Sequence, residues 1–237
     1  MKVKIIAIHQ PNFFPWLGYF NKINKSDVFI FLDDVQYPKT GGSWSNRVKF
    51  LISGTPNWVT ATIDRNYSGT RNINEMRFQT LTPPWQDKMM KSLENSYKKH
   101  PFYSEIMPVL EPLLRNDETN IADYNVHAVT QIASLLGMDL SKFKRSSDMH
   151  TIGSSNELLC ELTSALSGTI YMCGGGADGY QDEAIFTERG LKLQYQNFQH
   201  PVYAQRGQTE FVPGLSIIDA LMNVGAKGVA DLLQPKI

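Results

Sequence analysis

The sequence has 237 residues, of which 42% are hydrophobic and 19% charged, a composition that supports a buried core and excludes an intrinsically disordered chain. Its 23 Lys and Arg residues balance 23 Asp and Glu residues, so no overall basic field exists to attract nucleic acid or an anionic membrane. The two cysteines are too few for a disulfide framework, and no apolar run is long enough for a signal peptide or a membrane span. We therefore expect a cytoplasmic protein.

The first predicted elements are a strand, a helix and a second strand. Residues 3–8 form a β-branched apolar run that is typical of a buried strand. Residues 16–24 carry apolar side chains at helical spacing, after a turn that Pro11 and Pro15 restrict. Residues 28–32 form a second apolar run. This order predicts an α/β fold with a mostly parallel sheet flanked by helices.

The middle of the chain differs in composition. Residues 36–78 are rich in Gly, Ser, Asn, Arg and Lys, and we expect an irregular, partly stranded excursion there. Residues 83–115 predict two helices, and residues 120–136 predict a further helix that ends at a glycine. We expect a single domain over residues 1–237, with a helical insertion at about residues 83–137.

The last third of the chain resumes the alternation of helices and strands after an expected linker at residues 141–151. Ser154 and Glu157 have the spacing of a capping box, which predicts the start of the next helix. The remaining expected elements are a strand at residues 169–173, a helix at 182–189, a strand at 191–195 and a helix at 216–233.

The first candidate site is the segment that leads from the first strand into the first helix. Ligands of open α/β sheets bind at the carboxyl ends of strands, and a new helix presents free N–H groups to an anion. A histidine here can act as an acid, a base or a hydrogen-bond donor near neutral pH. The alternative is a proline-rigid turn covered by core aromatic side chains. The candidate residues are His9, Gln10, Trp16, Gly18, Tyr19 and Lys22.

The second candidate site follows the second strand. Paired acids at this position can bind magnesium or orient a hydroxyl or an amine, and nearby Arg and Lys side chains can hold a phosphate. In the alternative, the acids cap the next element and the basic side chains are solvated. We assign no metal ligands. The candidates are Asp34 as a catalytic residue and Asp33, Gln36, Lys39, Trp44, Asn46 and Arg47 as binding residues.

A glycine-rich segment after the strand at residues 169–173 forms the third candidate site. Backbone amides in such a segment can curl around an oxyanion. The alternative is a tight connection between a strand and a helix. The candidate residues are Gly174, Gly175 and Tyr180.

The fourth candidate site lies near the C-terminal end. His200 follows a predicted strand and is a candidate base, with Tyr203 and Gln205 as binding candidates. Ser216 is predicted as a helix N-cap with Asp219 at the third helical position, so we expect structural roles for both. Neither cysteine has a base beside it in the sequence, and we do not expect a thiol nucleophile.

Several stretches carry a resemblance to a known family. They are His9-Gln10-Pro11, Pro15-Trp16-Leu17-Gly18-Tyr19-Phe20 with Lys22, Asp27-Val28-Phe29, and Leu32-Asp33-Asp34-Val35-Gln36-Tyr37. Together they resemble the WbqC-like proteins, and the segments around His200 to Gln205 and Phe211 to Asp219 are similar to that family's closing motif. The resemblance spans nearly the whole chain. It implies an association with gene sets for bacterial O-antigen or other surface polysaccharides.

This resemblance implies a small-molecule substrate, for which a nucleotide-linked amino sugar is the leading candidate. Our main hypothesis is transfer of an acyl or aminoacyl group to the amine of that sugar. His9 or His200 would deprotonate the ammonium, amides near Gly174 would hold the developing oxyanion, and the Arg and Lys cluster would bind the diphosphate. The cofactor and the number of chains in any homo-oligomer stay open.

Two alternatives remain. The turn from Pro11 to Tyr19 is similar to the strand-to-helix turn of HxGH-type nucleotidylyltransferases and their amide-forming relatives, although Trp16 and Tyr19 replace both signature histidines. That likeness favours a nucleotide-binding enzyme. The aromatic content instead suits a non-catalytic module that binds carbohydrate or protein during glycan assembly, and its four tryptophans are Trp16, Trp44, Trp58 and Trp85.

Overall fold

The computed structural model describes residues 2–40, 43–174 and 181–234. Two predicted binding residues, Gly175 and Tyr180, lie outside the described residues. The chain divides into two compact units, which are described separately below. Unit 1 comprises Met1–Gln10, Gly18–Asp34 and Asp139–Gln199, and unit 2 comprises Pro11–Leu17, Val35–Met138 and His200–Ile237.

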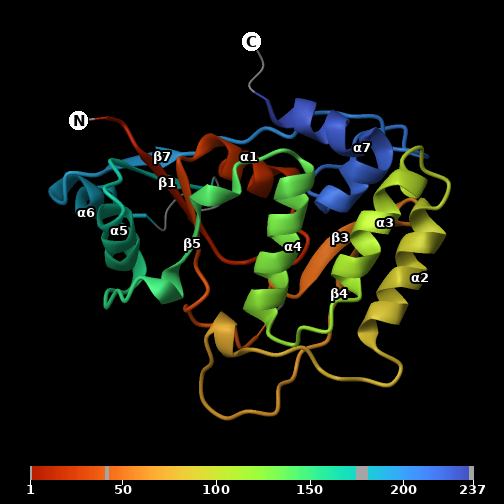
Figure 1. Ribbon diagram of the computed structural model, residues 1–237, viewed down its shortest axis with the longest axis horizontal. Coiled ribbons are helices and arrows are strands. Elements are labelled where there is room, and N and C mark those ends of the chain that lie inside the picture. The colour runs from red at the N-terminus through yellow and green to blue at the C-terminus, as the bar shows by residue number, and fades with distance from the viewer. Residues whose placement is uncertain (1, 41–42, 175–180, 235–237) are drawn as a thin grey trace. The chain divides into compact units, whose positions relative to one another are not determined.

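Unit 1 contains a parallel sheet that has five strands within the described residues. The strand order is β5-β2-β1-β6-β7. Figure 1 shows these strands, which are β1 (Ile5–His9), β2 (Val28–Phe31), β5 (Phe143–Arg145), β6 (Ile170–Cys173) and β7 (Lys192–Tyr195). The central strands β1 and β2 are continuous apolar runs because both of their faces are covered. The predicted α/β fold with a mostly parallel, helix-flanked sheet is confirmed.

Helices lie on both faces of this sheet. Side chains alternate between the faces of a strand, so Ile6 and Ile8 of β1 point to the face covered by α5 (Ser155–Ala165) and α6 (Glu183–Glu188). On the opposite face, α1 (Leu17–Lys25) packs against β2, where the rings of Tyr19 and Phe29 have centroids 5.3 Å apart. Unit 1 is therefore a three-layer α/β/α arrangement.

Two expectations about this unit are wrong. The expected linker at residues 141–151 contains the edge strand β5, which pairs in parallel with β2, and it also contains the 3-10 helices η2 (Leu140–Lys142) and η3 (Ser146–Asp148). The predicted capping box at Ser154 does not form, because the Ser154 side chain accepts no cap hydrogen bond. The helix α5 nevertheless begins at the next residue, as predicted.

Unit 2 combines a hairpin with helices. The hairpin turns at Ser53 and Gly54, whose φ angles of 51° and 78° are those that a two-residue turn between antiparallel strands requires. Helices α2 and α3 run side by side (Figure 1). The elements are β3 (Arg47–Ile52), β4 (Thr55–Thr60), η1 (Ile73–Glu75), α2 (Trp85–Tyr97), α3 (Tyr103–Leu114), α4 (Ile121–Leu135) and α7 (Ile217–Leu233).

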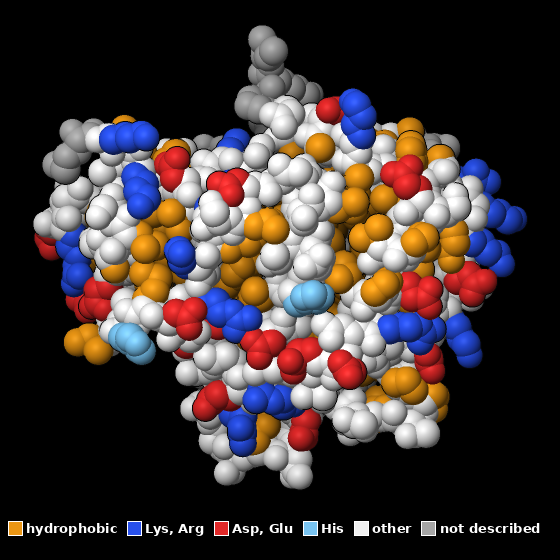
Figure 2. Space-filling model, viewed as in Figure 1, with side chains coloured by type: hydrophobic (Ala, Val, Ile, Leu, Met, Phe, Trp, Pro, Cys, Tyr) orange, Lys and Arg blue, Asp and Glu red, His pale blue; other side chains and the backbone are white. Residues whose placement is uncertain are grey.

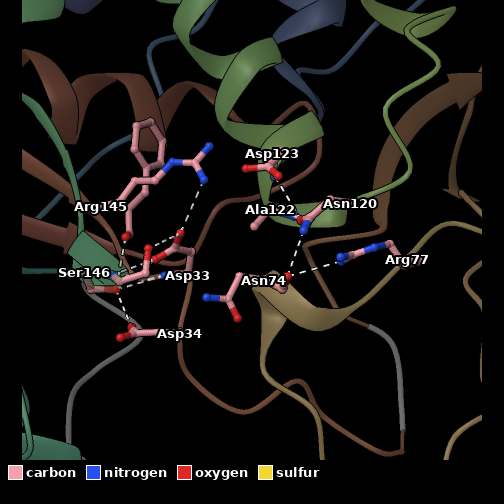
Figure 3. Close-up of polar contacts among 11 residues, drawn as sticks. Asp33, Asp34, Asn74, Arg77, Asn120, Ala122, Asp123, Arg145 and Ser146 are labelled. Carbon is pink, nitrogen blue, oxygen red and sulfur yellow. Dashed lines mark hydrogen bonds and ion pairs between the residues drawn. The ribbon is translucent and has the colours of Figure 1, made fainter. Parts of the chain in front are cut away.

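An aromatic cluster forms the core of unit 2. Phe13 stacks on Tyr124 of α4 at 5.9 Å, and Phe78 and Trp85 pack against the same tyrosine. Asn120 caps α4 by accepting hydrogen bonds from the backbone N–H groups of residues 122 and 123 (Figure 3). Trp85 is buried in this cluster, so it is a core residue and does not contribute to a binding surface.

Charges of both signs are distributed over the surface. On the face seen in Figure 2, Lys and Arg side chains alternate with Asp and Glu side chains, in keeping with the zero net charge. Within the described part of the chain, no helix has the combination of length and apolar character that a membrane-spanning helix needs.

Candidate functional site

The carboxyl ends of β1 and β6 mark the position in unit 1 where a ligand is expected. From β1 the sheet continues to β2 in one direction, whereas β6 and β7 extend it in the other. Open α/β sheets bind ligands in the crevice at such a reversal of strand order. The last registered pair of these strands is Ala7 with Met172, so His9 and Gly174 each lie two residues beyond it. A Cβ atom on Gly174 would meet nothing within 4 Å, which indicates open space.

His9 is neutral in this position. Its Nδ1 lies 3.1 Å from the carbonyl oxygen of Gln10, and because a carbonyl only accepts, Nδ1 carries the hydrogen and Nε2 is an acceptor. Burial and the neighbouring Lys22 ammonium lower the pKa of His9 to about 3. An imidazole with this pKa accepts a hydrogen bond but retains a proton poorly, which weakens the prediction that His9 deprotonates an ammonium.

The buried ammonium group of Lys22 lies at the same edge of the sheet. The residue is 2% exposed, and its Nζ donates a hydrogen bond of 2.8 Å to the carbonyl oxygen of Ile8. Within the described residues no carboxylate forms an ion pair with it. Burial lowers its pKa to about 8, so the ammonium is still charged at neutral pH. A buried cation without a carboxylate is costly and suits a site for an anionic ligand.

The start of α1 is fixed at this edge. Gln196, which follows β7, donates from Nε2 to the carbonyl oxygen of Gly18 at 2.7 Å and to Oδ1 of Asn21 at 3.0 Å. Tyr19 donates its hydroxyl to the Gln10 carbonyl at 3.0 Å. The side chain of Gln10 has no hydrogen-bond partner among the described residues. The predicted residues His9, Gln10, Gly18, Tyr19 and Lys22 are thus brought together in unit 1.

Asp33 and Asp34 lie in different environments (Figure 3). Asp33 is fully buried and accepts hydrogen bonds from the backbone N–H and the hydroxyl of Ser147, at 3.1 and 3.0 Å. Arg145 approaches the same carboxylate at 3.7 Å. Asp34 is half-buried and accepts a hydrogen bond from Ser146 through one carboxylate oxygen. Asp33 therefore links β2 to the segment after β5, and Asp34 is the more available acid.

Unit 2 contains a second candidate site, which we call the tryptophan platform. Trp44 lies between two other tryptophans, with ring centroids 5.5 Å from Trp16 and 4.9 Å from Trp58. Trp44 and Trp58 are 39% and 40% exposed. The His200 ring lies 6.5 Å from the ring of Trp16. The platform comprises Trp16, Trp44, Trp58, Arg47, Lys49 and His200.

Two cations border the platform. The guanidinium of Arg47 lies 4.3 Å from the ring centroid of Trp58, and the Lys49 ammonium lies 5.0 Å from it. Both cations occupy the outward face of β3, where they alternate with the buried Val48 and Phe50. Lys49 is the Cα partner of Trp58 in the hairpin register. The hairpin therefore presents an aromatic surface with positive charge beside it.

Backbone hydrogen bonds hold the separate segments of the platform. Phe13 donates to the Trp44 carbonyl at 2.8 Å, Ser216 donates to the Lys49 carbonyl at 2.9 Å, and Ile217 donates to the Pro15 carbonyl at 2.9 Å. The Ser216 side chain also caps α7, as predicted. The opening motif, the hairpin and the closing motif therefore converge in unit 2.

The platform has unmet hydrogen-bonding capacity. Within the described structure, the buried indole Nε1 of Trp16 and the buried Nε of Arg47 have no hydrogen-bond partner. Buried N–H groups without an acceptor are rare, and they mark a position where a ligand or a water supplies one. Desolvation lowers the pKa of His200, so its imidazole is unprotonated at neutral pH and can accept a proton.

Other predicted residues of unit 2 have structural partners. Asn46 is buried and accepts a hydrogen bond from the Tyr37 hydroxyl at 2.7 Å. Gln36 and Lys39 are exposed. Tyr203 and Gln205 both donate to Oδ2 of Asp219.

Asp219 is the centre of a buried polar network. Its carboxylate accepts from the Tyr203 hydroxyl at 2.7 Å, from Gln205 Nε2 at 3.0 Å and from the Tyr97 hydroxyl at 3.0 Å. Burial raises the pKa of this fully buried carboxyl group. Through these contacts Tyr203 and Gln205 hold the Asp219 side chain of α7 in place. Their predicted binding role stays a prediction.

The two thiol groups lie in the interior of the protein. Both cysteines are buried, and desolvation raises the pKa of Cys160, which keeps this thiol protonated. Over residues 2–40, 43–174 and 181–234, no group of three or more His, Cys, Asp and Glu side chains is placed to hold a metal ion.

Several residues of these sites were not predicted from the sequence. Gln196, Ser146 and Ser147 have no local signal, because their partners lie more than 100 residues away in the chain. Lys49, by contrast, belongs to the Arg and Lys cluster that was expected to hold a phosphate, and its alternation with Arg47 and apolar residues before a Ser-Gly turn places both on one face of a hairpin strand.

Comparisons with known proteins agree with the resemblance. The sequence profile described as the WbqC-like protein family matches residues 10–231. An uncharacterized protein of Mycobacterium tuberculosis is 31% identical over 228 residues, which cover 95% of this chain and 96% of that protein. No solved structure matches the chain significantly.

Proposed function

Because the chain belongs to the WbqC-like protein family, we propose that it is an enzyme of bacterial surface-polysaccharide (O-antigen) biosynthesis that transfers an acyl or aminoacyl group to the amine of a nucleotide-linked amino sugar. The observation that carries this proposal is the tryptophan platform, which combines exposed indole rings, adjacent cations and unpaired N–H donors. A nucleotide-linked sugar needs all three kinds of contact.

Each part of such a substrate has a matching group. The exposed faces of Trp44 and Trp58 can stack on a nucleobase or on the apolar face of a pyranose ring. Arg47 and Lys49 supply the positive charge that a diphosphate requires, and the Arg47 fork can contact phosphate oxygens in bidentate fashion. The unpaired N–H of Trp16 can donate to a substrate oxygen.

His200 is the candidate base at the platform. In the proposed step, the sugar nitrogen attacks the carbonyl carbon of an activated acyl or aminoacyl donor and a C–N bond forms. The bond from that carbon to the donor's leaving group breaks, and the leaving group departs with the electron pair. His200, unprotonated at neutral pH, accepts the proton released from the nitrogen. His9 is the weaker candidate because of its low pKa.

Binding is tested first with the full chain. Nucleotide-linked amino hexoses are titrated by calorimetry, with the free nucleotide and the free amino sugar as comparisons. Loss of one stacked ring costs about 1–3 kcal/mol, so we expect Trp58→Ala to weaken binding by roughly fivefold to 150-fold. Lys25→Met, an exposed change on a helix of unit 1, is the control. Equal affinity of Trp58→Ala and the unaltered protein would refute the platform as the binding site.

Catalysis is tested separately from binding. A bound amino sugar is incubated with acyl thioester and aminoacyl donors, and product amide is followed by mass spectrometry. His200→Gln should retain substrate affinity and lower kcat by about 10²–10⁴ if His200 is the base. Sugar binding without turnover for every donor class would favour the alternative of a non-catalytic carbohydrate-binding module.

A second candidate function rests on unit 1. The reversal of strand order beside His9, together with the buried Lys22 ammonium, favours nucleotide binding like that of nucleotidylyltransferases or amide ligases. Asp34 would then be the available acid at the same sheet edge. Nucleotide affinity that is lost in Lys22→Met but kept in Trp58→Ala would favour this function over the first.

A further inference from the structure

Unit 2 contains a polar cavity of about 280 Å³, which we call the Arg206 pocket. Its walls come from the turn of the β3–β4 hairpin, from one side of α2 and from the segment that follows Gln205. This volume lies just below the usual range of about 300–1,000 Å³ for ligand sites, which suits a small ligand. The lining residues used below are Gly54, Ser92, Ser96, His100, Arg206 and Gln208.

The walls of the pocket are held in place by the fold. Gln208 donates from Nε2 to the Gly54 carbonyl at 3.0 Å, which joins the hairpin turn to the opposite wall. The backbone N–H of Arg206 donates to Oδ1 of the buried Asn223 at 2.8 Å. Ser92 and Ser96 are four residues apart on α2 and therefore share one face of that helix. The polar groups are thus positioned before any ligand binds.

Two nitrogen-bearing groups in the pocket lack partners. The Nδ1 atom of His100 is buried and has no hydrogen-bond partner among the described residues. Its ring is fixed against Tyr97, with centroids 4.7 Å apart. The Arg206 guanidinium likewise forms neither an ion pair nor a side-chain hydrogen bond within the described part of the chain. Burial is the main cause that lowers the pKa of His100; the Asp219 carboxyl opposes this and Arg206 adds to it, and the net lowering leaves Arg206 as the positive charge of the pocket.

The charges of the residues that line the pocket indicate which kind of ligand it binds. None of the described lining residues is acidic, and Arg206 is the cation among them. The Ser92 hydroxyl already donates to the Lys88 carbonyl at 2.9 Å, whereas the Arg206 guanidinium, the Ser96 hydroxyl and the His100 imidazole form a donor set for an oxyanion, because Arg can donate two parallel hydrogen bonds to it. Asp219, which acts electrostatically on His100, does not line the pocket and already accepts hydrogen bonds from Tyr97, Tyr203 and Gln205.

We propose that the Arg206 pocket binds a phosphate group, with Arg206 as the charged donor and His100 and Ser96 as hydrogen-bonding partners. The pocket shares no lining residue with the tryptophan platform, although Lys49 of the platform and Leu51 of the pocket wall lie two residues apart on β3. The proposal holds whether or not the platform binds a nucleotide sugar.

The test uses the full chain with inorganic phosphate and, in a second arm, with a hexose phosphate. Binding is followed by the NMR signals of the His100 ring and by calorimetry, with chloride added to keep the ionic strength constant. We expect saturable shifts of His100 and at least about tenfold weaker binding in Arg206→Gln. Arg71→Gln, an exposed arginine of the same unit that stacks on Tyr67, should bind as the unaltered protein does.

The two ligands distinguish free phosphate from a phosphomonoester as the source of the phosphate group, and the variants test whether the site exists. Binding of both ligands indicates recognition of the phosphate group alone, and binding of only the hexose phosphate indicates a phosphomonoester ligand. Ser96→Ala provides a second variant, which should weaken binding without altering the fold. The proposal is overturned if neither ligand shifts His100 at tens of millimolar, or if Arg206→Gln and Arg71→Gln bind equally.

Discussion

The substitution Lys22→Met tests the cation beneath the sheet edge of unit 1. Methionine preserves the length and the apolar stem of the side chain but removes the buried ammonium and its hydrogen bond to the Ile8 carbonyl. Burial lowers the pKa of Lys22 from 10.5 to about 8 in the folded protein. The unfolded chain has the ordinary value, so folding and protonation are linked.

The sign and size of the effect follow from that difference. Between pH 8 and 10.5 the unfolded state keeps the proton on Lys22, whereas the folded state has lost it. The unfolded state then binds more protons, so the free energy of unfolding rises with pH across this range. A pKa of about 8 in place of 10.5 corresponds to a gain of about 3 kcal/mol. Below pH 8 Lys22 is charged in both states, so the folded state bears the full free-energy cost of burying that charge.

The assay is urea unfolding of the unaltered protein and of Lys22→Met at pH values from 7 to 10.5. Tyrosines also titrate at high pH, so the informative quantity is the difference in unfolding free energy between the two proteins. We expect Lys22→Met to be the more stable at pH 7, because the charge no longer has to be buried, and this advantage should vanish by pH 10.5. Lys25→Met, on the exposed side of the same helix, should show no such trend. A difference that does not change with pH would refute the reasoning.

Two further substitutions test packing and the buried network. In Gly168→Ala the added Cβ would lie 2.4 Å from the Ile6 Cγ1 atom and 2.8 Å from the Thr163 carbonyl oxygen, so we expect urea unfolding to show a loss of about 1–3 kcal/mol. Gly174→Ala, where the Cβ meets nothing within 4 Å, is the control and should be near neutral. Asp219→Ala leaves two tyrosine hydroxyls and a glutamine amide without their acceptor, and thermal and urea unfolding should show a loss of about 3–5 kcal/mol. A loss below about 1 kcal/mol would contradict the structural role of that carboxylate.

The elements that were predicted are those whose local pattern matches their burial. Strands β1 and β2 are buried on both faces and therefore read as continuous apolar runs. Helix α4 has a buried face at helical spacing and ends before Gly137, whose φ of 71° suits glycine. Strand β5 has no such pattern, because its three residues are Phe, Lys and Arg and only pairing with β2 makes them a strand.

For the candidate sites, the sequence predicted the features that depend on local position in the chain and missed those that depend on tertiary association. Position after a strand is a local property, so His9 and Asp34 could be placed at the carboxyl end of the sheet from sequence. Association of Trp16, Trp44 and Trp58 is a tertiary property, which depends on hydrogen bonds between segments distant in the chain. Sequence spacing alone therefore did not distinguish these platform rings from a tryptophan of the core.

The opening motif shows why its functional and structural interpretations could not be separated from spacing. Its residues belong to both compact units, since Gln10 and Gly18 fall in unit 1 and the stretch Pro11–Leu17 falls in unit 2. In unit 2, Phe13 packs in the aromatic core, so this part of the motif has a structural role. In unit 1, the polar side chain of Gln10 at the sheet edge has no hydrogen-bond partner among the described residues, which core packing does not explain. Both roles therefore occur in one continuous stretch of chain, at neighbouring positions that only the fold distinguishes.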